Sequence, residues 1–117
     1  MLQAAMHRVV EIIGTSMGNV QEAEDHILRM RGHAGLNREF TEFFALVGGP
    51  TTACARAAQQ RRQITIMDVT DSEVFDNESR CVIIRAGSLA CHSVPLLDGT
   101  GTLLGVISAH WPSPGPS

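Results

Sequence analysis

The fold of this chain is decided by residues 93–111, which read SVPLLDGTGTLLGVISAHW. Two apolar runs, 89–97 and 103–111, flank the polar residues DGTGT. An Asp-Gly pair between two such runs favours a tight turn that joins antiparallel strands. The sequence therefore predicts a β-hairpin here. The Pro-rich residues PSPGPS that follow, at 112–117, are typical of a linker.

One further hairpin and one further strand are predicted upstream. In residues 17–33 the alternation LRMR at 28–31 has the period of two of a half-buried strand, and EAEDH at 22–26 supplies the turn. Residues 63–69, QITIMDV, read as a strand with both isoleucines on one face.

The other segments have helical signals. Helices are expected over 2–13, 37–47, 53–58 and 79–87. Asn37 is the expected cap of the second helix, and Thr51 or Thr52 of the third. The expected buried stripe of the second helix is Phe40, Phe43, Phe44 and Val47. This order of elements favours an α+β fold, in which helices cover the faces of a mainly antiparallel sheet.

Composition limits the function. The chain has 117 residues with 44% apolar residues, enough for the core of one domain. A net charge of −3 argues against nucleic acid as a partner, and no run approaches the roughly 20 apolar residues that span a membrane. Three cysteines with irregular spacing do not suggest a disulfide framework, so a reducing cytoplasm is expected.

Several segments in this order make the chain similar to a GAF domain, the small-molecule sensor and dimerisation module of many bacterial signalling proteins. They are GNVQ at 18–21, FTEFF at 40–44, TTACARAAQQRRQITIMDV at 51–69 and SVPLLDGTGTLLGVISAHW at 93–111. The subtype found with PAS domains and histidine kinases is the most similar. The resemblance implies a GAF domain over 1–111, with a central antiparallel sheet of five or six strands, helices on both faces, and an exit linker at 112–117.

The resemblance also places a ligand pocket beneath the loop TDSEVFDNE at 70–78. The expected ligand-binding residues are Phe44, Asp68, Phe75, Arg80 and His92. Phe75 would anchor a lid, and Arg80 or Arg85 would pair with a small anion. The alternative is a solvated acidic loop. The residue pattern of cyclic-nucleotide-binding GAF domains is not found, so cyclic AMP or GMP is not expected.

Cys91 and His92 are adjacent in a predicted strand, where neighbours point to opposite faces. They cannot easily act on one substrate together, so we expect one in the core and the other toward the pocket or solvent. In phytochrome-like GAF domains the bilin-binding Cys-His pair precedes the strand instead. The five histidines lack metal-site spacing, and neither metal nor cofactor is expected.

An enzymatic alternative comes from the same fold. Free methionine-(R)-sulfoxide reductases are GAF-domain enzymes, and Cys54 and Cys81 resemble their cysteines in position. A thiolate would attack the sulfoxide sulfur, and a second thiol would resolve the sulfenic acid. The last strand of that family supplies acids, whereas this one reads GVISAHW. The alternative role of both cysteines is helix packing.

The first helix gives the remaining expectation. Its apolar residues Met6, Val9, Val10 and Ile13 are predicted to form a dimer interface while other residues of the helix cover the sheet. Trp111 is expected to pack under the exit linker. Together these observations predict a cytoplasmic regulatory module without catalysis of its own. It would be a homodimer that senses a small molecule, or only dimerises, and acts on an output domain or partner signalling protein.

Overall fold

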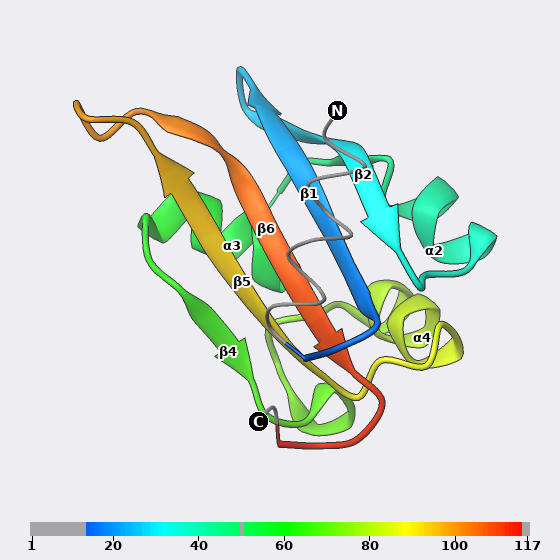
Figure 1. Ribbon diagram of the computed structural model, residues 1–117. Coiled ribbons are helices and arrows are strands. Elements are labelled where there is room, and N and C mark those ends of the chain that lie inside the picture. The colour runs from blue at the N-terminus through cyan, green and yellow to red at the C-terminus, as the bar shows by residue number, and fades with distance from the viewer. Residues whose placement is uncertain (1–13, 50, 116–117) are drawn as a thin grey trace.

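The computed structural model describes residues 14–49 and 51–115. The helix expected over 2–13, with its dimer contacts, lies outside these residues. The described elements are β1 (Met17–Glu24), β2 (Ile27–Ala34), α2 (Arg38–Phe43), β3 (Leu46–Val47), α3 (Ala53–Gln60), β4 (Ile64–Ile66), the 3-10 helix η1 (Val69–Asp71), α4 (Asn77–Arg85), β5 (Ala90–Leu97) and β6 (Leu103–Trp111) (Figure 1).

The strands form one six-stranded sheet in the order β3-β2-β1-β6-β5-β4, and every neighbouring pair is antiparallel. The expected α+β fold is therefore confirmed. The predicted C-terminal hairpin contributes β5 and β6, and β6 pairs with β1 at the centre of the sheet. Among the described residues, no helix is long and apolar enough to cross a membrane.

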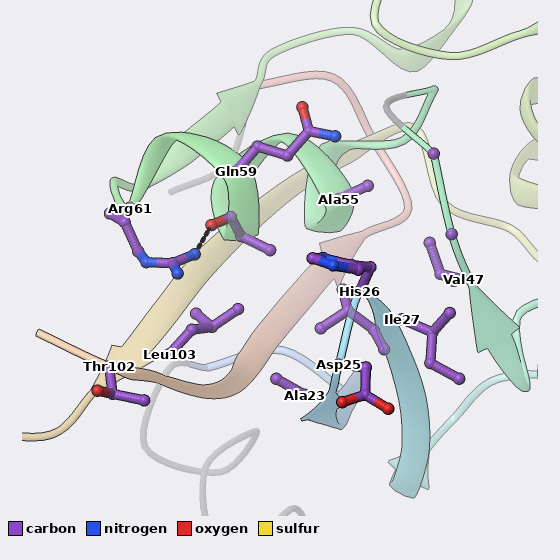
Figure 2. Close-up of a pocket in the computed structure, with 14 residues that line it drawn as sticks. Ala23, Asp25, His26, Ile27, Val47, Ala55, Gln59, Arg61, Thr102 and Leu103 are labelled. Carbon is purple, nitrogen blue, oxygen red and sulfur yellow. Dashed lines mark hydrogen bonds between the residues drawn. The ribbon is translucent and has the colours of Figure 1, made fainter.

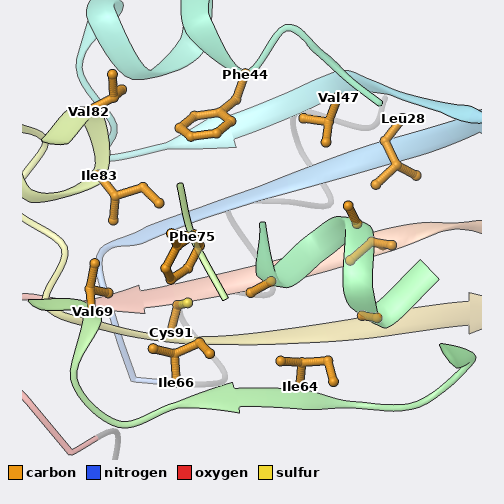
Figure 3. Packing of buried hydrophobic residues seen from close by; sticks show 14 of the residues in the cluster. Leu28, Phe44, Val47, Ile64, Ile66, Val69, Phe75, Val82, Ile83 and Cys91 are labelled. Carbon is orange, nitrogen blue, oxygen red and sulfur yellow. The ribbon is translucent and has the colours of Figure 1, made fainter. Parts of the chain in front are cut away.

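The core lies between the sheet and α2, α3 and α4, which pack on the same face (Figure 1). Figure 3 shows Phe75 reaching from the loop before α4 toward Cys91 of β5, between the helical layer and the sheet. Side chains of the other sheet face form separate small clusters. One contains Val20, Ala34 and Ile107, and the other contains Ala90, Ala109 and Trp111.

The helix predicted over 37–47 is shorter than expected. Asn37 does cap it, since its side chain accepts a hydrogen bond from Phe40 N. The helix ends at Phe43, and Val47, expected on its buried stripe, belongs instead to β3. The reason is non-local, because Leu46 and Val47 pair with Arg29 and Leu28 of β2. Phe43 is consequently 37% exposed.

Other boundaries also differ from the predictions. The strand expected over 63–69 stops at Ile66, because Asp68 caps η1 by accepting from Thr70 N. β1 continues through Glu24, so the first hairpin turns at Asp25 and His26 alone. α4 begins earlier than expected, with Asp76 as its cap. The α3 cap is Thr52, one of the two expected residues.

The predicted turn between β5 and β6 forms, but its hydrogen bonds and its left-handed residue differ from those of the expected Asp-Gly turn. The Asp98 carboxylate accepts hydrogen bonds from Thr100 N, Thr100 Oγ1 and Thr102 N. The left-handed residue of the turn is Gly101, with φ of 86°, and not the glycine of the Asp-Gly pair. Local side-chain capping therefore holds a longer connection than a two-residue turn.

We predict that Gly105→Ala destabilises the fold. A Cβ atom on Gly105 would lie 2.1 Å from the carbonyl oxygen of Gln21, so the pairing of β6 with β1 would have to shift. Such overpacking costs about 3 kcal/mol, a loss that urea unfolding measures directly.

Gly99→Ala is the matched control, since a Cβ atom there meets nothing within 4 Å. Equal stability losses in the two variants would contradict this account of the β1–β6 contact.

Candidate functional site

A small cavity lies beneath Phe75, between the inner face of the sheet and the helices. Its volume is about 20 Å³, which is space for water and not for an organic molecule. It is lined by Asn19, Gln21, Phe40, Phe44, Thr52, Ala53, Cys54, Phe75, Ile83, Cys91, Ser93, Ser108 and His110.

The floor of this cavity is a row of polar side chains from the three central strands. Cross-strand partners share a face, and Asn19 is paired with Ser108, which is paired in turn with Ser93. Gln21 and His110 lie on the same face, one alternation along β1 and β6 respectively. All five are at most 4% exposed. An inner sheet face is ordinarily apolar, so burial of this row costs free energy unless each polar atom finds a partner.

Only part of this row is satisfied within the protein. Ser93 Oγ lies 2.7 Å from Ser108 Oγ, and His110 Nδ1 lies 2.8 Å from Ser88 Oγ. Asn19 Oδ1, Gln21 Oε1 and His110 Nε2 are buried without a hydrogen-bond partner. Each such atom costs about 1–3 kcal/mol in a folded protein. Three of them belong to residues that line one cavity, which has room for water.

Burial sets the charge state of this site. It lowers the pKa of His110 to about 4, so the imidazole is neutral at pH 7. The Phe40 ring meets the His110 ring edge-on, with centroids 5.4 Å apart. The cavity lining contains no Asp, Glu, Lys or Arg. The arrangement can therefore hold a neutral polar group but has no counter-ion for a charged one.

The two cysteines at the cavity are poor nucleophiles. Burial raises the pKa of the Cys54 thiol, and it raises that of Cys91 to about 12. Cys54 Sγ also lies 3.2 Å from Thr52 Oγ1, and hydrogen bonding from the Thr52 and Gln21 side chains only partly offsets the effect of burial on its pKa. Both groups are therefore protonated near neutral pH, whereas nucleophilic attack needs a thiolate. Cys81 is exposed on α4 and does not line the cavity.

We call residues 72–76 the lid, because Phe75 in this segment lines the cavity. Arg80 holds the lid in place through hydrogen bonds. Arg80 Nη2 donates to the carbonyl oxygens of Ser72 at 2.6 Å and Phe75 at 3.1 Å. Arg80 Nη1 donates to Asn77 Oδ1 at 2.9 Å. These bonds hold Phe75, which is 5% exposed, over the polar row. These contacts of the Nη donors indicate that Arg80 positions the lid, while its Nε is buried without a hydrogen-bond partner.

The structure separates the five residues predicted to bind a ligand. Phe44 and Phe75 line the cavity, and Arg80 stands behind the lid. Asp68 caps η1 instead, accepting from Thr70 N at 3.0 Å. His92 lies on the opposite sheet face, where its ring meets that of Trp111 with centroids 5.1 Å apart.

Cys91 and His92 are thereby on different faces, with Cys91 in the core, as the strand period predicts. Trp111, expected under the exit linker, is buried against Ala90 and Ala109. Arg85, the alternative anion partner, bridges α4 to α2 through Glu39 at 2.7 Å.

Sequence reasoning missed the polar row. A signal was present, since Asn19 and Gln21 alternate with Gly18 and Val20 along β1. Polar residues at every second position indicate one polar strand face. The sequence does not say that this face is the buried one. Among residues 14–49 and 51–115, no group of three or more His, Cys, Asp or Glu could hold a metal ion.

Comparison with known proteins places this geometry in a family. The family model described as "GAF domain" matches residues 1–117. No curated protein sequence matches the chain. Among solved structures, the GAF domain of an Acinetobacter phosphoenolpyruvate-protein phosphotransferase is similar with a TM-score of 0.77 and 13% identity, covering 98% of this chain and 66% of that one.

Two further solved structures are similar. A domain from Sinorhizobium meliloti, described as part of a two-component sensor histidine kinase protein, has a TM-score of 0.77 and 18% identity, covering 97% of this chain and 72% of that one. Free methionine-R-sulfoxide reductase from Neisseria meningitidis has a TM-score of 0.76 and 14% identity, covering 99% and 64%. At such identities the likeness shows the fold alone. The chain spans roughly two thirds of the length of these structures.

The buried imidazole predicts a loss of stability in mild acid. The pKa of His110 falls from 6.5 unfolded to about 4 folded, so the unfolded chain binds more protons between these values. The contribution of His110 to the free energy of unfolding should therefore be constant above pH 6.5 and fall as the pH drops toward 4, by about 3 kcal/mol in all. Urea unfolding at a series of pH values measures this. The His110→Gln variant should lose this part of the slope, and an unchanged slope in that variant would contradict the assignment to His110.

The lid contacts predict a local effect of Arg80→Met. This change keeps an apolar stem but removes three donated hydrogen bonds, and charged donors of this kind are worth about 1.5–3 kcal/mol each. Amide hydrogen exchange within residues 72–76 should accelerate at least about tenfold, since 1.4 kcal/mol corresponds to that factor.

Arg85→Met is the matched control on the same helix, because Arg85 bonds Glu39 and not the lid. Lid exchange that is unchanged in Arg80→Met, or equally fast in both variants, would refute the role given to Arg80.

Proposed function

The chain belongs to the GAF domain family, and we propose that it is a regulatory module that senses a small, neutral, polar molecule in the cavity beneath Phe75. In this proposal it has no catalysis of its own. The observation that carries the proposal is the convergence of Asn19 Oδ1, Gln21 Oε1 and His110 Nε2, all buried and unpartnered, on one cavity. A molecule that hydrogen-bonds to these three atoms would remove the free-energy cost of burying them without partners.

The proposed sensing step is a movement of the lid. The cavity of about 20 Å³ accommodates water, so a larger guest would displace residues 72–76. Arg80 connects that segment to α4, and Arg85 connects α4 to α2 through Glu39. A molecule that binds one position of the lid better than another would shift the populations of two contacts, Arg80 with the lid and Arg85 with Glu39. An output domain or partner protein would respond to that shift.

Dimerisation remains part of the proposal. Met6, Val9, Val10 and Ile13 lie outside the described residues, and their apolar helical spacing is what supports an interface. A double change, Val9→Glu with Ile13→Glu, would then leave a folded monomer.

We do not propose the reductase activity. The similar reductase structure shares the fold at 14% identity. Of the two cysteines of that alternative, Cys54 has a pKa raised by burial, and Cys81 is exposed on α4 and does not line the cavity. Replacing Cys54 and Cys81 by residues of similar volume should therefore leave the function of the module intact.

The proposal predicts a retained small molecule. Native mass spectrometry of protein purified from a bacterial host should show a mass surplus that disappears on denaturation. Gln21→Met, which keeps the side-chain length but removes the buried acceptor, should lower the fraction of protein that carries this surplus at least about tenfold. Loss of one hydrogen bond to a buried group corresponds to that factor.

Gln63→Met is the matched control, because Gln63 is exposed and does not line the cavity. No surplus in the native protein, or an equal surplus in both variants, would argue against sensing at this cavity. The same spectra report whether the native mass is that of a dimer.

A further inference from the structure

A second, much larger hollow opens farther along the same sheet, between the tip of the first hairpin and the C-terminal half of α3. Its volume is about 570 Å³, within the range of about 300–1,000 Å³ typical of small-molecule sites. We call it the hairpin groove. It lies beyond the polar row, since β1 contributes Ala23 here and Gln21 to the cavity. It is therefore independent of the function proposed above.

The floor of the hairpin groove is an opening into the main core. Leu28, Val47 and Ala55 are buried members of the core cluster, at 4–7% exposure, and each lines the groove. Ala58 and Leu103 pack partly buried beside them. Short side chains at the α3 positions leave space above the sheet. An apolar body placed here would cover surface at about 25 cal/mol per Å².

The rim of the groove carries one acidic and one basic side chain that form no ion pair with each other. Asp25 lies at the hairpin tip and Arg61 at the end of α3, and no salt bridge joins them. In the described part of the chain, the side chains of Asp25, His26 and Gln59 form no hydrogen bond or salt bridge. Figure 2 shows Asp25, His26 and Arg61 around the hollow, with Arg61 also bonded to the Ala58 carbonyl oxygen.

Backbone conformation is unusual at one of these two positions, Arg61. Asp25 and Arg61 are the residues other than glycine with positive φ in the described structure, at 54° and 55°. At the end of a helix this conformation is usually taken by Gly or Asn, and a larger residue pays a strain of about 1 kcal/mol or more. Arg61 is such a helix end, whereas Asp25 lies in the two-residue turn of the first hairpin, where Asp tolerates this conformation.

We propose that the hairpin groove binds a small zwitterion with an apolar side chain, of the class of the hydrophobic α-amino acids. Asp25 takes the ammonium group, and the exposed Arg61 side chain leaves the Ala58 carbonyl oxygen and turns inward to take the carboxylate. The apolar side chain of the ligand lies on Leu28, Val47 and Leu103. A simple anion or cation would satisfy one rim charge and leave the other unpaired. A neutral apolar molecule would use neither, so the zwitterion is the class that fits the whole lining.

The test is an NMR titration of the full chain with L-phenylalanine up to about 10 mM, above the millimolar Kd of a weak small ligand. The amides of Gly48, Gly49 and Thr102 should shift saturably. Phenylalanine amide, which lacks the carboxylate, and hydrocinnamate, which lacks the ammonium, should each bind at least about tenfold more weakly. Glycine, which lacks the apolar side chain, should give no saturable shift.

Variants of the protein complete the test. Asp25→Asn and Arg61→Gln should each weaken L-phenylalanine binding at least about tenfold, while Arg38→Gln, at an exposed ion pair with Glu42, leaves it unchanged. Unshifted groove amides, or equal binding of all the analogues, would overturn the proposal. Shifts concentrated at Asn19, Ser93 and Ser108 would also overturn it, because the ligand would then occupy the cavity beneath Phe75.

Discussion

The pairing of β1 with β6 is the constraint on which the rest of the structure depends. It places Asn19 beside Ser108 and Gln21 beside Val106 on the inner sheet face. Since side chains alternate along a strand, a slip of one residue would turn the polar row outward. Gly105 allows the two backbones to approach at the end of this pairing, where a Cβ atom would strike the Gln21 carbonyl oxygen. The site and the fold thus share one register.

Burial of the polar row lowers the free energy of unfolding of this domain. Apolar side chains in place of Asn19, Gln21 and His110 would remove three unpartnered buried atoms at no loss of core volume. The surrounding structure compensates with close packing, because Phe40 and Phe44 cover the row from α2 and Phe75 covers it from the lid.

Helix α3 is common to both hollows. Its first residues, Ala53 and Cys54, line the cavity beneath Phe75, and its last turns line the hairpin groove. The two hollows differ in chemistry, because the cavity has a neutral polar lining and the groove has an apolar floor with charges at its rim. On the two proposals made above, they would bind different molecules at opposite ends of one helix.

Local chemistry was enough to predict much of the fold. The caps at Asn37 and Thr52, the C-terminal hairpin, and the separation of Cys91 from His92 follow from side chains and periods that act within a few residues. The order of segments was enough to identify the family. The caps, the hairpin and the separation of the two side chains depend on contacts between neighbours in the chain, so the sequence by itself determined them.

Tertiary structure decided the remainder. β3 forms at residues that read as helix, because β2 offers an edge to pair with. Phe44 and Phe75 could be selected as apolar anchors, but Asn19, Gln21 and His110 meet only after β1 and β6 have paired and α2 and the lid have closed over them. Which face of a strand is buried, and which polar atoms then lose water, is fixed by segments distant in the chain, and no local pattern records it.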